Sequence, residues 1–217
     1  MKKKMLFALS AVSAAMLAMP ALASALPAHL DATSTFTISS GTFVIQEKEG
    51  STMHATGFSG SGAFTNTTTG TLNMTYTGVT INGSIGCGST AQGHSEASKT
   101  VTMTPLEFHL IMIATDRPGI LITPNAATGA FLHYRCFLVE KTVTGAGIIG
   151  EIISPACGVA SKTAILKIRG TDGTQEILTY TDKTYDLHTN SGATAALNVP
   201  SNWTFSFPAA RTITCTH

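Results

Sequence analysis

The chain has 217 residues, of which only 12% are charged, with 13 Lys and Arg set against 12 Asp and Glu. Nucleic-acid-binding proteins normally carry a basic stripe, and proteins held on anionic membranes a polybasic patch. A charge this low and this balanced argues against both classes, so we expect no nucleic-acid partner. Threonine, which occurs 35 times, supplies much of the polar character, and its branched Cβ favours strands over helices.

The first 25 residues have the pattern of a secretory signal peptide. A basic segment, Lys2 to Lys4, precedes an apolar run from Met5 to Met19, and small residues follow Pro20. The run is shorter than the roughly 20 apolar residues that span a bilayer. We predict cleavage after Ala23 or Ala25, with no integral membrane segment afterwards, and therefore a secreted protein, either extracellular or associated with the cell envelope.

The remaining residues show the patterns of short strands separated by turn residues. We predict strands at 33–46, 71–82, 106–113, 120–123, 130–139, 148–153, 163–169, 176–181, 193–199, 203–207 and 211–216. Roughly eleven to thirteen short strands favour an all-β fold, either a β-sandwich or a jelly-roll-like barrel. Little or no helix is expected after the signal peptide, at most one or two turns near Gln92 to Lys99. We expect a single all-β domain over 26–217; two domains would divide near Gly83 to Lys99.

Three local features mark turns or irregularities within this strand pattern. The apolar phase changes at Gly78, which predicts a β-bulge there. Asp116-Arg117-Pro118-Gly119 is a strong turn signal, and Thr171-Asp172-Gly173-Thr174 predicts a hairpin turn.

Four cysteines in an exported chain predict two disulfides, because none of the close Cys pairs typical of metal sites is present. Loop entropy does not separate the three possible pairings. We favour Cys87–Cys136, because both residues flank a predicted hairpin. The second bridge, Cys157–Cys215, would then tie the last strand to the loop around Pro155.

Two motifs resemble catalytic or cofactor-binding patterns, but their contexts disagree with those functions. Gly145 to Gly150 matches G-x-G-x-x-G, yet β-branched residues and Pro155 follow where a dinucleotide-binding protein has a helix. Gly57 to Gly62 lacks the last glycine of the hydrolase motif G-x-S-x-G, and we interpret it as a flexible loop or edge strand. We therefore predict no cofactor and no catalytic residue from these motifs.

Isolated carboxylates and histidines are candidate acid, base or metal-binding groups. Glu107 and Glu151 lie in strongly apolar strand contexts, where desolvation could raise a pKa, although a solvent-facing position is the more common case. His109 and His133 alternate with apolar neighbours and could face each other across a sheet. No H-E-x-x-H or close His pair occurs, so no metal site is predicted.

One strand carries three aromatic residues on one face, Trp203, Phe205 and Phe207. If exposed, this row would form a surface on which a sugar could stack. Burial of a large aromatic side chain stabilises a fold by roughly 2–3 kcal/mol, which favours a place in the core. Because an exposed row could bind a sugar, these three residues are candidate ligand-binding residues.

Several short motifs recur in fixed order between Cys87 and Ile153. They are Cys87-Gly88-Ser89-Thr90, 104–110 (TPLEFHL), 119–124 (GILITP), Phe131 with Cys136, and 143–145 (VTG) with 148–152 (IIGEI). This region resembles a group of uncharacterised exported all-β proteins of actinobacteria. The resemblance implies export and a bridge between Cys87 and Cys136, and it assigns no catalytic role to any residue.

Together these features predict an exported, disulfide-stabilised, non-catalytic protein of the cell envelope or extracellular space, with a binding or structural role. Cell-wall glycan or sister subunits are the expected partners. Two alternatives remain open. The first is a secreted carbohydrate-active enzyme that uses Glu107 or Glu151 as acid or base. The second is a self-assembling subunit of the fimbrial type.

Overall fold

A computed structural model of the chain describes residues 28–48, 50–90, 93–103, 105–124 and 129–215. The described residues lie mostly in antiparallel strands, joined by one short 3-10 helix, η2 (Glu96–Ser98). The all-β prediction is therefore confirmed, as is the expectation of at most a helical turn or two near this position. The predicted signal peptide lies outside the described residues.

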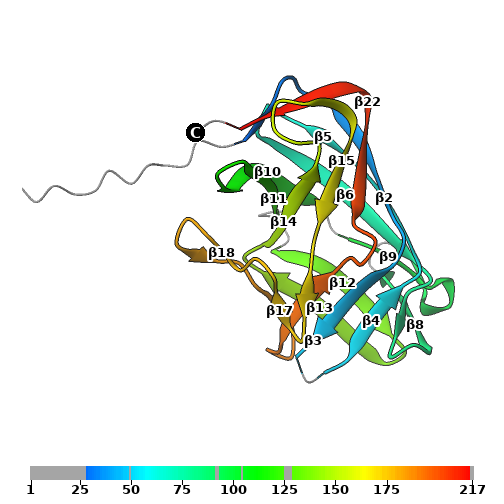
Figure 1. Cartoon of the computed structure of the whole chain (residues 1–217). Helices are drawn as coiled ribbons and strands as arrows, with labels where there is room; N and C mark the ends of the chain where they lie inside the picture. Colours follow the sequence, from blue (N-terminus) through cyan, green and yellow to red (C-terminus); the bar gives the residue numbers. More distant parts are fainter. Residues whose placement is uncertain (1–27, 49, 91–92, 104, 125–128, 216–217) are drawn as a thin grey trace, which may run out of the picture.

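Eight strands close into the first of two barrels, which fills the upper half of Figure 1. In order around the barrel they are β22 (Trp203–Thr214), β15 (Ala160–Lys167), β14 (Ile148–Ser154), β11 (Arg117–Pro124), β10 (Leu106–Ala114), β6 (Thr69–Thr77), β5 (Gly57–Phe64) and β2 (Thr35–Ser40). Pairing of β2 with β22 closes the ring. Two short strands extend it, β1 (His29–Leu30) beside β22 and β9 (Thr100–Thr102) beside β6.

Eight further strands close the second barrel, in the lower half of Figure 1. In order they are β12 (Ala130–Cys136), β13 (Val139–Gly145), β20 (Leu187–Thr189), β21 (Thr194–Asn198), β3 (Phe43–Glu47), β4 (Thr52–Ala55), β7 (Thr80–Ile81) and β8 (Ile85–Gly88). The chain alternates between the barrels, usually one hairpin at a time, so no single point in the sequence separates them. Their strands also number more than the eleven to thirteen predicted.

Two small hairpins lie in the connection between β15 and β20. The first, β16 (Gly170–Thr171) and β17 (Thr174–Gln175), contains the predicted hairpin turn. The second pairs β18 (Thr179–Tyr180) with β19 (Lys183–Thr184). The predicted strand at 176–181 is thus reduced to two residues. Ile177 and Tyr180 pack instead on an apolar cluster outside the first barrel.

One continuous cluster of buried side chains runs through both barrels. An aromatic contact joins them where the barrels meet, since Phe43 of β3 and Tyr76 of β6 have ring centroids 3.9 Å apart. Within the first barrel, Phe58 stacks on Trp203 at 5.2 Å. The Tyr76 hydroxyl donates to Met103 Sδ at 3.3 Å, and burial raises the pKa of Tyr76 well above its ordinary value. The two barrels therefore share one hydrophobic core, to which strands from the whole length of the chain contribute.

Gly78 lies where the chain leaves the first barrel for the second, and its φ is +63°. A Cβ atom here would lie 2.0 Å from Thr56 Oγ1, so both the backbone and the space favour glycine. The predicted change of apolar phase is correct, since Tyr76 and Val79 are both buried. The predicted β-bulge is wrong, because the phase changes where one barrel's strand ends and the other's begins.

One predicted turn is shifted along the chain, and one predicted strand is divided into two. The β10–β11 turn consists of Thr115 and Asp116, because Ala114 pairs with Arg117, so the prediction at Asp116 to Gly119 is two residues late. The predicted strand 130–139 is two strands, β12 and β13, joined by Phe137 and Leu138. No glycine or proline marks that turn, which is why the sequence pattern concealed it.

Both disulfides have the pairing that the sequence favoured. Cys87–Cys136 joins neighbouring strands β8 and β12, with a Cα–Cα distance of 4.2 Å. Cys157–Cys215 ties the β14–β15 loop to the residue after β22. The disulfides lie in different barrels, so each half of the molecule has its own covalent link.

A buried ion pair lies inside the second barrel, near the end remote from the first. Glu47 is 6% exposed, and its two carboxylate oxygens lie 2.8 and 3.2 Å from Lys141 Nζ. Ser51 Oγ donates to the same carboxylate at 3.0 Å. Burial, and secondarily the Glu47 charge, raises the pKa of neighbouring Tyr134. This ion pair occupies the end of the barrel interior, whereas apolar side chains occupy the rest of that interior.

Candidate functional site

Four adjacent strands of the first barrel carry no charged residue over a wide area. Residues 35–40, 57–64, 69–77 and 203–210 contain no Asp, Glu, Lys, Arg or His. Along each strand apolar side chains point inward and alternate with small polar ones that point outward, as a barrel wall requires. We call the outward residues the hydroxyl face: Thr35, Thr37, Ser39, Ser59, Ser61, Thr71, Asn73, Thr75, Thr204 and Ser206.

Strand register arranges these polar groups in rows across the barrel wall. One row consists of Ser206, Thr37, Ser61 and Asn73, each directly opposite the next on β22, β2, β5 and β6. A second row, Thr204–Ser39–Ser59–Thr75, lies two residues along the strands. Neighbours within a row are about 4.8 Å apart, and rows about 6.7 Å apart. The face therefore presents hydrogen-bonding groups at regular spacing.

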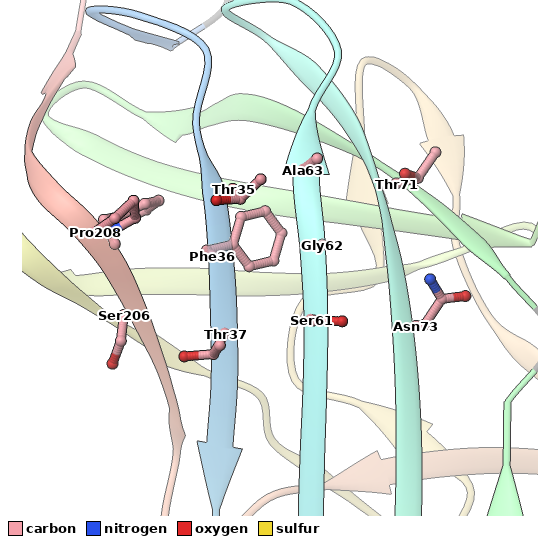
Figure 2. A pocket seen from close by; sticks show the side chains of 11 residues that line it. Thr35, Phe36, Thr37, Ser61, Gly62, Ala63, Thr71, Asn73, Ser206 and Pro208 are labelled. Atoms are coloured by element: carbon pink, nitrogen blue, oxygen red, sulfur yellow. The ribbon is translucent and has the colours of Figure 1, made fainter.

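A groove of about 650 Å³ lies across this face (Figure 2). Its lining comes from the same four strands: Thr35, Phe36, Thr37, Ser61, Gly62, Ala63, Thr71, Asn73, Ser206, Phe207 and Pro208. Figure 2 shows the Phe36 ring beside Gly62, with polar side chains around it. The groove thus combines two small apolar residues, Ala63 and Pro208, with hydroxyl and amide groups.

Gly62 lies on the inward side of β5, opposite the buried residues Phe36 and Leu72. A Cβ atom at this position would lie 2.4 Å from Phe36 Cζ and 2.4 Å from the Thr71 carbonyl oxygen. Any larger residue would displace the Phe36 ring within the core. The glycine-rich segment 57–62 is thus an interior strand between β2 and β6, which corrects the prediction of a flexible loop or edge strand.

The chemistry available in the groove is hydrogen bonding without charge. Hydroxyl groups both donate and accept, and the Asn73 amide does the same through separate atoms. None of the lining residues is an acid, base or metal ligand at neutral pH. The groove can hold a neutral polar ligand, and its lining offers no group for proton transfer.

The predicted aromatic row lies on the opposite side of the same barrel wall. Trp203, Phe205 and Phe207 are 0%, 3% and 8% exposed. They pack in the core, and the ring centroids of Phe205 and Phe36 are 5.2 Å apart. The possible role of these three residues in stacking on a ligand is therefore corrected: their strand turns them inward, and its outward residues Thr204 and Ser206 belong to the hydroxyl face.

The structure does not bring Glu107 and Glu151 together as a carboxylate pair. Glu107 is opposite Thr123 and Glu151 opposite Gly119, so they are two strands and four residues apart, about 16 Å. Glycosidase pairs lie within roughly 10 Å. A hydrogen bond from Arg117 Nε, 2.8 Å from Glu151 Oε1, lowers the pKa of Glu151, opposite to the shift that a general acid needs.

The histidines are likewise dispersed. His109 lies on β10 of the first barrel and His133 on β12 of the second, so the two do not face each other across one sheet. Within the described part of the chain, no three His, Cys, Asp or Glu side chains gather as a metal site would require.

Comparison with known proteins adds no relative from which a function could be transferred. No protein-family model matches the chain, and no match was found among curated proteins or solved structures. None of the helical residues described forms a segment long and apolar enough to cross a membrane.

Sequence analysis predicted strands at 33–46 and 71–82 but did not predict this site. Alternation in 35–37 (TFT), 59–61 (SGS) and 71–73 (TLN) is visible in the sequence. The pairing of β2 with β5 and of β5 with β6 brings these segments onto one face, and the pairing of β2 with β22 adds residues about 170 positions away.

Proposed function

We propose that this chain is an exported, disulfide-stabilised, non-catalytic protein of the cell envelope or extracellular space that binds neutral polysaccharide on its hydroxyl face. One observation carries the proposal: four adjacent strands present an uncharged array of hydroxyl and amide groups around a groove. Sugar hydroxyls are neutral donors and acceptors, and such a lining satisfies them without desolvating a charge. The two disulfides agree with an oxidising compartment outside the cytosol.

The groove itself supplies the specificity that the proposal needs. The Ala63 and Pro208 side chains give a sugar ring a small apolar contact, while Thr37, Ser61 and Asn73 address its hydroxyl groups. With no charged group among the lining residues, binding is expected to be insensitive to salt. Charged polysaccharides gain no ion pair here and are expected to bind no better than neutral ones.

Truncation of one row tests the proposal. Thr37→Ala/Ser61→Ala/Asn73→Ala removes three polar groups from the groove, each worth about 1 kcal/mol in a net hydrogen bond. We expect retardation by neutral polysaccharides in affinity gel electrophoresis to fall ten- to hundredfold. The control, Thr171→Ala/Thr179→Ala/Thr184→Ala, removes three exposed threonine side chains from the small hairpins and should bind as the native protein does. Equal binding by both variants would refute the assignment of the face.

Two further measurements address the remaining parts of the proposal. Cell fractionation should recover the protein outside the cytosol, and release from the envelope by wall digestion would identify glycan as what retains it. Turnover of a polysaccharide or ester by the purified protein would contradict the non-catalytic role. In that event Glu107→Gln/Glu151→Gln tests the enzyme alternative, which full activity of the double variant would eliminate.

A further inference from the structure

A cluster of exposed apolar side chains lies at the end of the second barrel. Phe137, Leu138 and Val139 are 70%, 83% and 52% exposed, and Ile85 is 44% exposed. These four account for most of the large apolar side chains exposed among the described residues. Phe137, Leu138 and Val139 are consecutive, and Ile85 lies two residues before Cys87, which is opposite Cys136. We call these four residues the apolar tip.

The apolar tip projects from the molecule and is held rigidly. Phe137 and Leu138 form the two-residue turn between β12 and β13, since Cys136 pairs with Val139. The chain enters β12 from β11 of the first barrel and leaves β13 for β14, so this turn is the part of the hairpin farthest from that barrel. The Cys87–Cys136 disulfide links the last residue of β12, next to the turn, to β8. The hydroxyl face belongs to the opposite barrel.

Neither folding nor turn geometry accounts for these residue types. Phe137 has a φ of +56°, a left-handed conformation that is rare for a bulky side chain. Two-residue hairpins with a positive φ at the first central position favour glycine there. The Phe137-Leu138 turn therefore has an unfavourable backbone conformation, and folding buries neither side chain in compensation. Such a feature points to a partner outside the chain.

Charged residues of both signs begin immediately behind the apolar tip. Arg135 Nε lies 2.5 Å from Glu96 Oε1, and His133 Nε2 lies 3.2 Å from Glu140 Oε1. Arg135 and Glu140 are also directly opposite each other, one pair behind Cys136 and Val139. The apolar layer is thus two residues deep on each strand, about 7 Å.

We propose that the apolar tip inserts into the interfacial layer of a lipid bilayer with zwitterionic headgroups. The depth of the apolar layer matches the 5–10 Å or so to which interfacial elements enter a membrane. At that depth Arg135, Glu96 and Glu140 lie among the headgroups, so residues of both charge signs meet a layer that carries both charges. A projecting hairpin can enter fluid acyl chains, whereas a protein partner would need a matching cavity. This inference is independent of the polysaccharide proposal.

Flotation with phosphatidylcholine vesicles tests the inference, with protein expressed from the full coding sequence and its N-terminus determined by mass spectrometry. The native protein should float with the vesicles at both low and high salt. Phe137→Gly/Leu138→Ser, which suits the turn, should lower the vesicle-bound fraction at least about tenfold without lowering the thermal midpoint. Ile153→Ser/Val159→Ser removes a matched exposed apolar pair, 50% and 51% exposed, and should leave flotation unchanged.

A spectroscopic measurement reports insertion directly. Phe137→Trp places an indole in the apolar tip, and brominated phosphatidylcholine should quench its emission, while the buried Trp203 stays unquenched in the native protein. Absence of flotation by the native protein, or equal flotation by Phe137→Gly/Leu138→Ser, would overturn the proposal. So would a lipid-free dimer in sedimentation that this double variant abolishes, because the apolar tip would then be covered by a second copy.

Discussion

Glu47→Gln tests whether burial determines how much an ion pair contributes to the free energy of unfolding of this protein. The substitution keeps the size of the side chain and its hydrogen bond from Ser51, but it leaves the Lys141 ammonium without its counter-charge. Lys141 is only 14% exposed, so water replaces little of what the carboxylate supplied. A charge left alone in a protein interior is destabilising because neither solvent nor a partner compensates it.

The magnitude follows from the distance and the burial. Breaking a buried pair by removing one partner typically costs about 3–5 kcal/mol. For a protein of this size each kcal/mol lowers the thermal midpoint by roughly 2–4 °C, so we expect a decrease of about 6–20 °C. Replacing both partners, Glu47→Met/Lys141→Met, should recover most of the loss, because the charge and its partner leave together.

The matched control is the exposed pair Lys167–Glu176, whose atoms lie 2.7 Å apart. Its side chains are 32% and 47% exposed, and Glu176→Gln should cost less than about 1 kcal/mol. Urea unfolding and calorimetry of the three variants and the native protein measure both effects. Equal losses from Glu47→Gln and Glu176→Gln would refute the reasoning, since distance rather than burial would then set the energy.

Three further predictions concern the disulfides, an acid-sensitive ion pair and Gly62. Reduction should lower stability by about 4 kcal/mol for each disulfide, because the linked cysteines are 49 and 58 residues apart, and an unchanged urea midpoint in reductant would contradict this. Because Arg117 lowers the pKa of Glu151 from its ordinary value of 4.5, their contact stabilises the fold above that pH and is lost as pH falls through the lower folded-state pKa. Melting curves between neutral and acid pH should show a smaller decline for Arg117→Gln than for the native protein, and an identical decline would contradict this. Gly62→Val should cost about 1–3 kcal/mol by displacing the buried Phe36 ring, and an unchanged thermal midpoint would contradict this.

Local pattern predicted those features of the fold that depend on neighbours in sequence. Leu72, Met74 and Tyr76 alternate with polar residues and are all buried, as that alternation indicates. The disulfide pairing also followed from the position of cysteines beside a hairpin. Where no glycine or proline punctuates the chain, as at Phe137 and Leu138, the same reasoning missed a turn, because an apolar run gives no sign of where it reverses.

Residue content and local pattern were enough to predict the all-β class and the alternation of inward and outward residues, since both depend on local stereochemistry, and they favoured the cysteine pairing that the structure has. Long-range strand pairing set the division of the strands between two interleaved barrels. It also decided that Trp203, Phe205 and Phe207 turn inward, while Thr37, Ser61 and Ser206 become neighbours on the surface. These outcomes depend on register between strands distant in sequence, where the burial of a shared core, rather than any local preference, selects which face of each strand meets water.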